Sequence, residues 1–306
     1  MSETARDALV ERIAELKQQR HAVILAHNYQ REEVQRIADY TGDSLELARR
    51  AARTTAEVIV FCGVTFMAET AAVLCPGRLV LLPDLRSGCP MADMIDGAQL
   101  RAWKQEHPGA LVVCYVNSTA EVKAESDICC TSANAIEVVQ SLPADREVLF
   151  VPDQYLGGHV QRQTGRSLVL WPGFCPTHQR ITAEAIAARR AEYPGAPVLV
   201  HPECTPEAAA AADAVLSTGG MCRYASGSPA STLLIGTETG ILFRLGQENP
   251  GKRFVPVTED AVCPNMKRIT LEKIRHALEE LTHPITVPED TAHAARAALE
   301  RMLALG

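Results

Sequence analysis

The sequence lacks several features that would assign it to a class of proteins. It has no run of about 18 apolar residues, the length that a membrane-spanning helix needs. Its first residues, Met1 to Ala5, carry neither the basic nor the apolar segment of a secretory signal. Basic residues number 30 against 37 acidic ones and form no run, which argues against a nucleic-acid partner. We therefore expect a cytoplasmic protein that binds neither membranes nor nucleic acids.

Closely spaced cysteine pairs are also missing. The chain has ten cysteines but no Cys-x-x-Cys pair, which disfavours a zinc ribbon or a thioredoxin-type site. A reducing compartment disfavours disulfides as well. We expect seven of the ten to be small buried apolar residues: Cys62, Cys75, Cys114, Cys129, Cys130, Cys204 and Cys222. The other three, Cys89, Cys175 and Cys263, are each followed by proline.

These three Cys-Pro pairs belong to a repeat that runs through the chain. They are 86 and 88 residues apart, and each follows an apolar run typical of a strand buried on both faces. Three further sets of residues share one spacing of 88 and then 86 residues: His27, Tyr115 and His201; Tyr29, Asn117 and Glu203; Ser44, Ser132 and Thr218. The shared spacing indicates three similar units of about 85–90 residues.

The repeat predicts an α/β fold. Each unit reads as a βαβαβ-like segment, which folds as a three-layer αβα body with a parallel sheet. We expect the three units to surround a pseudo-threefold axis with a central active site. Their expected ranges are 1–108, 109–194 and 195–306, and they carry Cys89, Cys175 and Cys263, respectively. The last range includes two C-terminal helices that we expect to pack back on the body.

The repeated polar residues all fall where a strand ends. Ligands of parallel α/β sheets bind at these carboxyl ends, so three units around an axis would bring the residues into one cleft. Hydroxyls at helix starts, expected for Ser44, Ser132 and Thr218, suit carboxylate or phosphate. Three converging thiolates suit a [4Fe–4S] cluster with one open iron, or a zinc ion with a water ligand. The sequence alone leaves both metals open.

Each residue also has a plain structural explanation. Ser44 could be a helix cap with no other role, and Glu203 could form a surface pair with His201. The common spacing favours function for the whole set. His178, three residues after Cys175, could support the site or face solvent. We interpret residues 236–240 as a tight turn in which Glu238 could face the cleft.

Eight motifs together resemble the quinolinate synthase family and span about residues 21–270 in order. They are Ala26-His27-Asn28-Tyr29-Gln30, Gly42-Asp43-Ser44, Gly88-Cys89-Pro90-Met91-Ala92-Asp93-Met94, Tyr115-Val116-Asn117, Cys130-Thr131-Ser132-Ala133-Asn134-Ala135, Gly173-Phe174-Cys175-Pro176, His201-Pro202-Glu203-Cys204 and Cys263-Pro264-Asn265-Met266-Lys267. So many ordered matches are far more specific than any single motif.

The resemblance implies an enzyme of NAD biosynthesis. It implies condensation of iminoaspartate with dihydroxyacetone phosphate to quinolinate, with loss of phosphate and water, and functional coupling to an iminoaspartate-producing enzyme. It also implies a [4Fe–4S] cluster on Cys89, Cys175 and Cys263. The implied substrate-binding residues are His27, Ser44, Tyr115, Val116, Asn117, Ser132, His201, Pro202, Glu203 and Thr218. Ring closure needs proton transfers, for which Glu203, His27, His201 and Tyr29 are the candidates, and Tyr29 matches the family position that assists the proton shifts of the triose.

Two other functions fit part of the pattern. Diphthamide-forming radical enzymes resemble three α/β units with one cysteine each, but they act on a protein and do not explain the His27-Asn28-Tyr29 and Gly42-Asp43-Ser44 motifs. A non-catalytic iron–sulfur sensor would need no ring of serine, tyrosine, asparagine and histidine side chains around its cluster.

Overall fold

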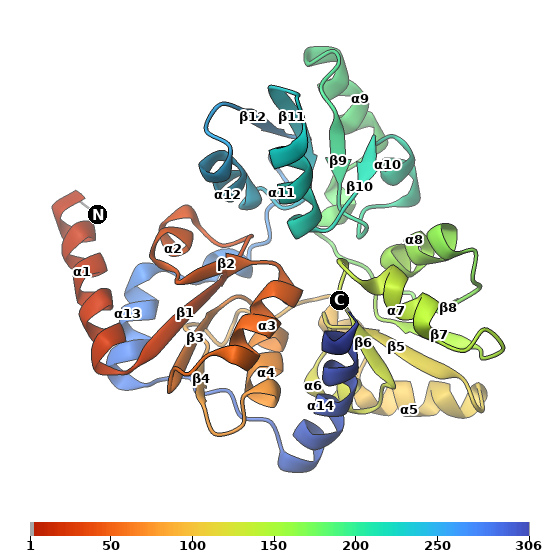
Figure 1. Cartoon of the computed structure of the whole chain (residues 1–306), viewed down its shortest axis with the longest axis horizontal. Coiled ribbons are helices and arrows are strands. Elements are labelled where there is room, and N and C mark those ends of the chain that lie inside the picture. Colours follow the sequence, from red (N-terminus) through yellow and green to blue (C-terminus); the bar gives the residue numbers. More distant parts are fainter. Residues whose placement is uncertain (1–2, 306) are drawn as a thin grey trace.

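Three lobes of similar build surround a common centre (Figure 1). The computed structural model describes residues 3–305. Each lobe contains one four-stranded parallel sheet flanked by helices. The predicted α/β fold of three repeated αβα units is confirmed.

Helices and strands alternate in the same order in every unit. The first unit contains α1 (Glu3–Gln19), β1 (Ala22–His27), α2 (Glu32–Ile37), β2 (Tyr40–Gly42), α3 (Ser44–Arg53), β3 (Val58–Cys62), α4 (Thr65–Leu74), β4 (Leu79–Leu81) and η1 (Ala92–Met94). The second contains α5 (Gly97–Glu106), β5 (Leu111–Tyr115), α6 (Ala120–Ala124), β6 (Ile128–Cys130), α7 (Ala135–Ser141), β7 (Val148–Val151), α8 (Gln154–Thr164), β8 (Val169–Leu170) and η2 (His178–Arg180). The third contains α9 (Ala183–Glu192), β9 (Val198–Val200), α10 (Pro206–Ala210), β10 (Ala214–Val215), α11 (Thr218–Gly227), β11 (Thr232–Gly236), α12 (Ile241–Glu248), β12 (Arg253–Pro256) and η3 (Met266–Arg268). The tail contains α13 (Leu271–Glu280) and α14 (Glu289–Ala304).

All three sheets have the same strand order. In the first it is β2-β1-β3-β4, and the second and third sheets repeat it as β6-β5-β7-β8 and β10-β9-β11-β12. The chain leaves β1 toward one edge of the sheet and then returns on its other side, so the order reverses between β1 and β3. Parallel sheets bind ligands at the carboxyl ends of the strands beside such a reversal. The topology therefore directs His27, at the end of β1, and its counterparts in the other sheets toward the centre.

The sequence predicted three strands in each unit, but each sheet has a fourth, short strand at its edge. These strands, β2, β6 and β10, are only two or three residues long. A repeated aspartate holds each one to its neighbour: Asp39, Asp127 and Asp213 each accept a hydrogen bond at 2.7 Å from a backbone N–H of the first strand. They are again 88 and 86 residues apart. Strands this short carry too little hydrophobic alternation to be predicted from sequence.

Each Cys-Pro pair begins the same small turn. The carbonyl oxygens of Cys89, Cys175 and Cys263 accept a hydrogen bond from the backbone N–H four residues later, at 3.2–3.3 Å. A 3-10 turn begins three residues after each cysteine. Proline suits the second position of such a turn, because its N–H would have no partner there. The repeated dipeptide thus fixes the backbone on which each thiol is presented.

The tail helices pack away from the third unit. α13 lies against α1 and β3, and α14 lies against α4, α6 and β6, between the first two units (Figure 1). The helix that precedes the first strand of the second and third units packs against the next helix of the same unit: α5 contacts α6, and α9 contacts α10. The boundaries 1–108, 109–194 and 195–306 stay predictions. Of the helices in the described chain, none is long and apolar enough to cross a membrane.

Candidate active site

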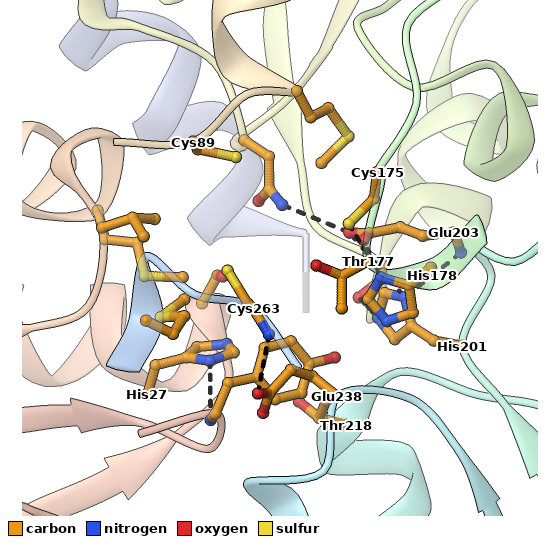
Figure 2. Close-up of a pocket in the computed structure, with 18 of the residues that line it drawn as sticks. His27, Cys89, Cys175, Thr177, His178, His201, Glu203, Thr218, Glu238 and Cys263 are labelled. Atoms are coloured by element: carbon orange, nitrogen blue, oxygen red, sulfur yellow. Dashed lines mark hydrogen bonds and ion pairs between the residues drawn. The ribbon is translucent and has the colours of Figure 1, made fainter. Parts of the chain in front are cut away.

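One central cavity receives side chains from all three units (Figure 2). Twelve of the predicted site residues line it: His27, Tyr29, Ser44, Cys89, Tyr115, Asn117, Ser132, Cys175, His201, Glu203, Thr218 and Cys263. Val116 and Pro202 are buried beside it but are not among its lining residues. The strand ends therefore bring together residues that lie up to 236 positions apart in the sequence.

The thiols of Cys89, Cys175 and Cys263 project into this central space (Figure 2). They are half-buried, whereas the other seven cysteines are buried, as predicted. Burial raises the pKa of Cys89 to about 12 and also raises the pKa of Cys175 and Cys263. Without a bound cation all three are therefore neutral thiols, and a metal would have to displace their protons.

The spacing of the thiols favours a cluster over a single ion. Three sulfurs around one zinc at 2.3 Å would lie about 3.8 Å apart. Among residues 3–305, the one group of three possible ligands whose atoms lie within 4.8 Å of one another is Cys175, His178 and Glu203. The three cysteine sulfurs are thus spread more widely than one zinc would require, which suits a multi-iron body.

The two histidines at the first-strand ends are held in one tautomer. Nδ1 of His27 accepts the backbone N–H of Tyr29 at 3.2 Å, and Nδ1 of His201 accepts that of Glu203 at 3.3 Å. The ring hydrogen of each neutral imidazole must therefore be on Nε2. Burial lowers the pKa of both histidines to about 3. Both rings thus act as neutral N–H donors, and Nε2 of His201 lies 3.2 Å from the Ser132 hydroxyl.

Glu203 is a buried carboxylate at the meeting point of two units, not a surface residue. Tyr115 donates its hydroxyl to Oε1 at 2.5 Å, and Nδ1 of His178 lies 2.8 Å from Oε2. Burial alone would raise the pKa of Glu203, but the neighbouring imidazoles of His178 and His201 and the hydrogen bonds from His178 and Tyr115 outweigh it and lower the pKa. Glu203 is therefore an ionised hydrogen-bond acceptor, only 3 % exposed.

A chain of hydrogen bonds links Tyr29 to Glu203. The Tyr29 hydroxyl lies 2.6 Å from Oγ1 of Thr237, which lies 2.8 Å from Nε2 of His178. In the neutral tautomer of His178 that donates from Nδ1 to Glu203, Nε2 accepts from Thr237 and Oγ1 of Thr237 accepts from Tyr29, so the donors all point from Tyr29 toward Glu203. Burial, followed by the charge of Glu203, keeps the pKa of Tyr29 well above its ordinary value.

Sequence reasoning assigned no role to Thr237 and left His178 undecided. His178 is 2 % exposed and Thr237 1 % exposed, so both belong to the interior of the site. Thr237 lies in the turn after β11, where only its position beside Glu238 could have drawn attention. For His178 the sequence did offer a signal, because the residue lies three positions after Cys175, within the turn that each predicted cysteine ligand begins.

Glu238 faces the cavity and supports the loop that carries Cys263 (Figure 2). Its Oε1 accepts the backbone N–H of Cys263 at 3.1 Å, and Nζ of Lys267 lies 2.9 Å away from the same oxygen. Lys267 also donates to the carbonyl of Tyr29 at 2.5 Å. The pair thereby fixes a thiol of the third unit relative to the tyrosine of the first.

The three hydroxyl residues differ in their helix positions. Ser44 and Thr218 are the first residues of α3 and α11, capped by the side chains of Asp43 and Ser217. Their first-turn N–H groups lack partners within the helix and can bind an anion. Ser132 was expected at a helix start as well, but α7 begins only at Ala135. The intervening residues form a turn, which removes Ser132 from the first helical turn.

Comparison with known proteins agrees with this geometry. Residues 11–304 match the family model described as "Quinolinate synthetase A protein". The chain is 58% identical over 298 residues to the quinolinate synthase of Dehalococcoides mccartyi strain CBDB1, covering 97% of this chain and 98% of the relative. Identity is 56% over 305 residues to that of Methanoregula boonei, covering all of both chains, and 54% over 309 residues to that of Thermus thermophilus, covering 98% of each. The chain therefore belongs to the quinolinate synthase family.

Proposed function

We propose that the chain condenses iminoaspartate with dihydroxyacetone phosphate to form quinolinate, with loss of phosphate and water, in the biosynthesis of NAD. Membership of the quinolinate synthase family supports this activity. The observation that carries the proposal is the single cavity in which one cysteine from each unit faces anion-binding hydroxyls and a buried carboxylate. Both substrates are anions, and their condensation requires several proton transfers.

A [4Fe–4S] cluster is the cofactor that best fits the donor set. Cys89, Cys175 and Cys263 would hold it, because they are the cysteines that line the cavity and are spread too widely for one ion. When bound by three cysteines, such a cluster supplies one iron with an open position that can act as a Lewis acid. Because the thiols stand on three separate turns, a cluster bound to all three would also tie the units to one another.

The substrates' anionic groups would be held by neutral donors. The first-turn hydroxyls and N–H groups at Ser44 and Thr218 suit carboxylate or phosphate oxygens. Nε2–H of His27 and of His201 adds directed hydrogen bonds without adding charge. Ser132, Asn117 and Tyr115 complete the ring of polar groups, and Val116 and Pro202 would contribute through their backbone.

Proton transfer would run through the tyrosine–glutamate chain. Tyr29 would hold the proton at the cavity, and Thr237 and His178 would pass it to the ionised Glu203. In such a relay Tyr29 takes up a substrate proton as it passes its own to Thr237, so that no buried phenolate has to form although burial raises the pKa of Tyr29. A positioned acid–base group of this kind contributes roughly 10²–10⁴-fold to a rate.

The instability of iminoaspartate in water indicates where its source must be. Imines of this kind hydrolyse in water, so an enzyme that oxidises the corresponding amino acid must supply the compound close to its point of use. We propose that the protein works in the cytoplasm in functional coupling with such an enzyme.

The direct test is turnover by anaerobically purified protein. Iron and sulfide content would be measured first, and quinolinate would then be quantified by chromatography after mixing the protein with iminoaspartate, generated in the assay, and dihydroxyacetone phosphate. We expect quinolinate and phosphate in equal amounts. Protein with a full complement of iron and sulfide that forms no quinolinate would contradict the proposal.

A further inference from the structure

A chain of three polar side chains joins the rim of the cavity to α12. Nη1 of Arg244, in α12 of the third unit, lies 2.9 Å from Oδ1 of Asn28 in the first unit. Nδ2 of Asn28 lies 3.0 Å from Oγ1 of Thr218, which returns the chain to the third unit and to the cavity. Asn28 itself is fully buried and does not line the cavity.

The arginine settles which way the asparagine amide points. A guanidinium can only donate hydrogen bonds, so the Asn28 atom that faces Arg244 must be the carbonyl oxygen. The amide nitrogen then faces Thr218 and can only donate to it. Oγ1 of Thr218 is therefore the acceptor, and its own hydrogen is left over. Within residues 3–305 the structure records no acceptor for that hydrogen, and Thr218 lines the cavity.

Arg244 is itself held in place from both sides. It lies 3.2 Å from Oε2 of Glu46 in the first unit and 2.7 Å from Oε1 of Glu248 on its own helix. Its side chain is only 18% exposed. The same Glu46 closes the capping box of α3, the helix that begins at Ser44. Arg244 is thus fixed relative to both helix starts that face the cavity.

We infer that Arg244 is a positioning residue that acts through Asn28 to make Thr218 a hydrogen-bond donor toward a negatively charged oxygen of the bound ligand. A hydroxyl can either donate or accept, and an anion requires a donor. The Arg244–Asn28 pair removes this ambiguity before the ligand arrives, so no reorientation is needed on binding. The inference rests on the proposed function only for the choice of ligands.

The sharpest test is Asn28→Asp. A carboxylate has the same shape and keeps its pair with Arg244, but it can only accept, so Thr218 would donate to Asp instead of to the ligand. Losing a hydrogen bond to a charged group weakens binding roughly 10- to 100-fold. We expect that loss in Asn28→Asp and in Thr218→Val, and a cooperative melting transition above the assay temperature would confirm that both variants are folded.

Equilibrium binding separates this inference from catalysis. Inorganic phosphate and quinolinate would each be titrated into the cluster-loaded protein, without turnover, by calorimetry. Weaker binding of phosphate alone would assign Thr218 to the phosphate group, and weaker binding of quinolinate alone would assign it to a carboxylate. If Asn28→Asp binds both probes as tightly as the parent protein, the inference is wrong.

A double-mutant cycle distinguishes hydroxyl direction from added charge. If Asn28→Asp acts by turning the Thr218 hydroxyl, it should weaken binding no further in a Thr218→Val background. If it acts by repelling the anion, the two effects should multiply, and that result would overturn the inference. Arg244→Gln, which frees the amide to turn over, should raise KM for the substrate that Thr218 binds while kcat stays within about twofold; Arg244→Lys should restore part of the affinity.

Discussion

The imidazole of His178, from the second unit, lies 2.8 Å from the carboxylate of Glu203, from the third. Both side chains are almost fully buried. Their pairing lets the buried carboxylate remain ionised and joins it to Tyr29 of the first unit through Thr237. The site therefore exists only when all three units are docked.

Breaking the relay in its middle should slow catalysis and leave the cofactor in place. Thr237→Val keeps the shape of the side chain but removes the hydroxyl that joins Tyr29 to His178, and we expect kcat to fall roughly 10²–10⁴-fold. Thr239→Val, two residues further along the same turn, is the matched control and should retain near-parental kcat. Iron and sulfide content would be measured in both variants. Parental turnover by Thr237→Val would remove Thr237 from the relay.

Each of the three cavity cysteines should be needed for the cofactor. We expect Cys89→Ala, Cys175→Ala and Cys263→Ala each to lose most of the iron and sulfide found in the anaerobically purified parent protein. Cys75→Ala, which changes a buried cysteine of the first unit away from the cavity, should keep the parental content. Retention of a full cluster by Cys263→Ala would refute the model of one ligand per unit.

Acid should destabilise the protein through its buried neutral histidines. The pKa of His27 is about 3 in the fold, against an ordinary value of 6.5. Below pH 6.5 the histidine therefore binds a proton in the unfolded chain but not in the folded one. The free energy of unfolding falls by about 1.4 kcal/mol per pH unit for each such histidine as the pH drops from 6.5 toward 3.

Replacing His27 should flatten this dependence. The melting temperature of the parent protein should fall more between pH 7.0 and 5.5 than that of His27→Asn, whose side-chain oxygen can still accept the Tyr29 N–H. His293→Asn, at an exposed position on α14, is the control and should behave like the parent. Equal losses in the parent and in His27→Asn would show that His27 is not held neutral.

Gly173 should not tolerate a side chain. A Cβ atom there would lie 2.3 Å from the carbonyl oxygen of Pro152, a backbone atom that cannot move aside easily. Gly173→Ala should therefore lower the melting temperature clearly and disturb the turn that presents Cys175, with part of the iron lost. Gly246→Ala in α12 meets nothing within 4 Å and replaces a poor helix former, so it should be neutral or stabilising by up to about 1 kcal/mol. A parental melting temperature and iron content in Gly173→Ala would contradict this steric account.

Much of the architecture could be predicted because the chain repeats itself. Nearly equal spacings of the Cys-Pro pairs and of the residues at the first-strand ends indicated three α/β units, and parallel-sheet topology predicted that those residues converge. Motif resemblance added the family. The short edge strands β2, β6 and β10 escaped prediction because two or three residues cannot show a hydrophobic period, although Asp39, Asp127 and Asp213 repeat in the same register.

Local hydrophobic patterning and chain spacing were enough to place residues at the strand ends and to single out the three cysteines that precede proline. The hydrogen-bond partners across units follow instead from the way the three units dock. Thr237, His178 and Arg244 lie outside the repeated set, and each acquires its role from a partner on another unit. Hydrogen bonds form over about 3 Å, and such contacts between distant segments exist only after the units have docked.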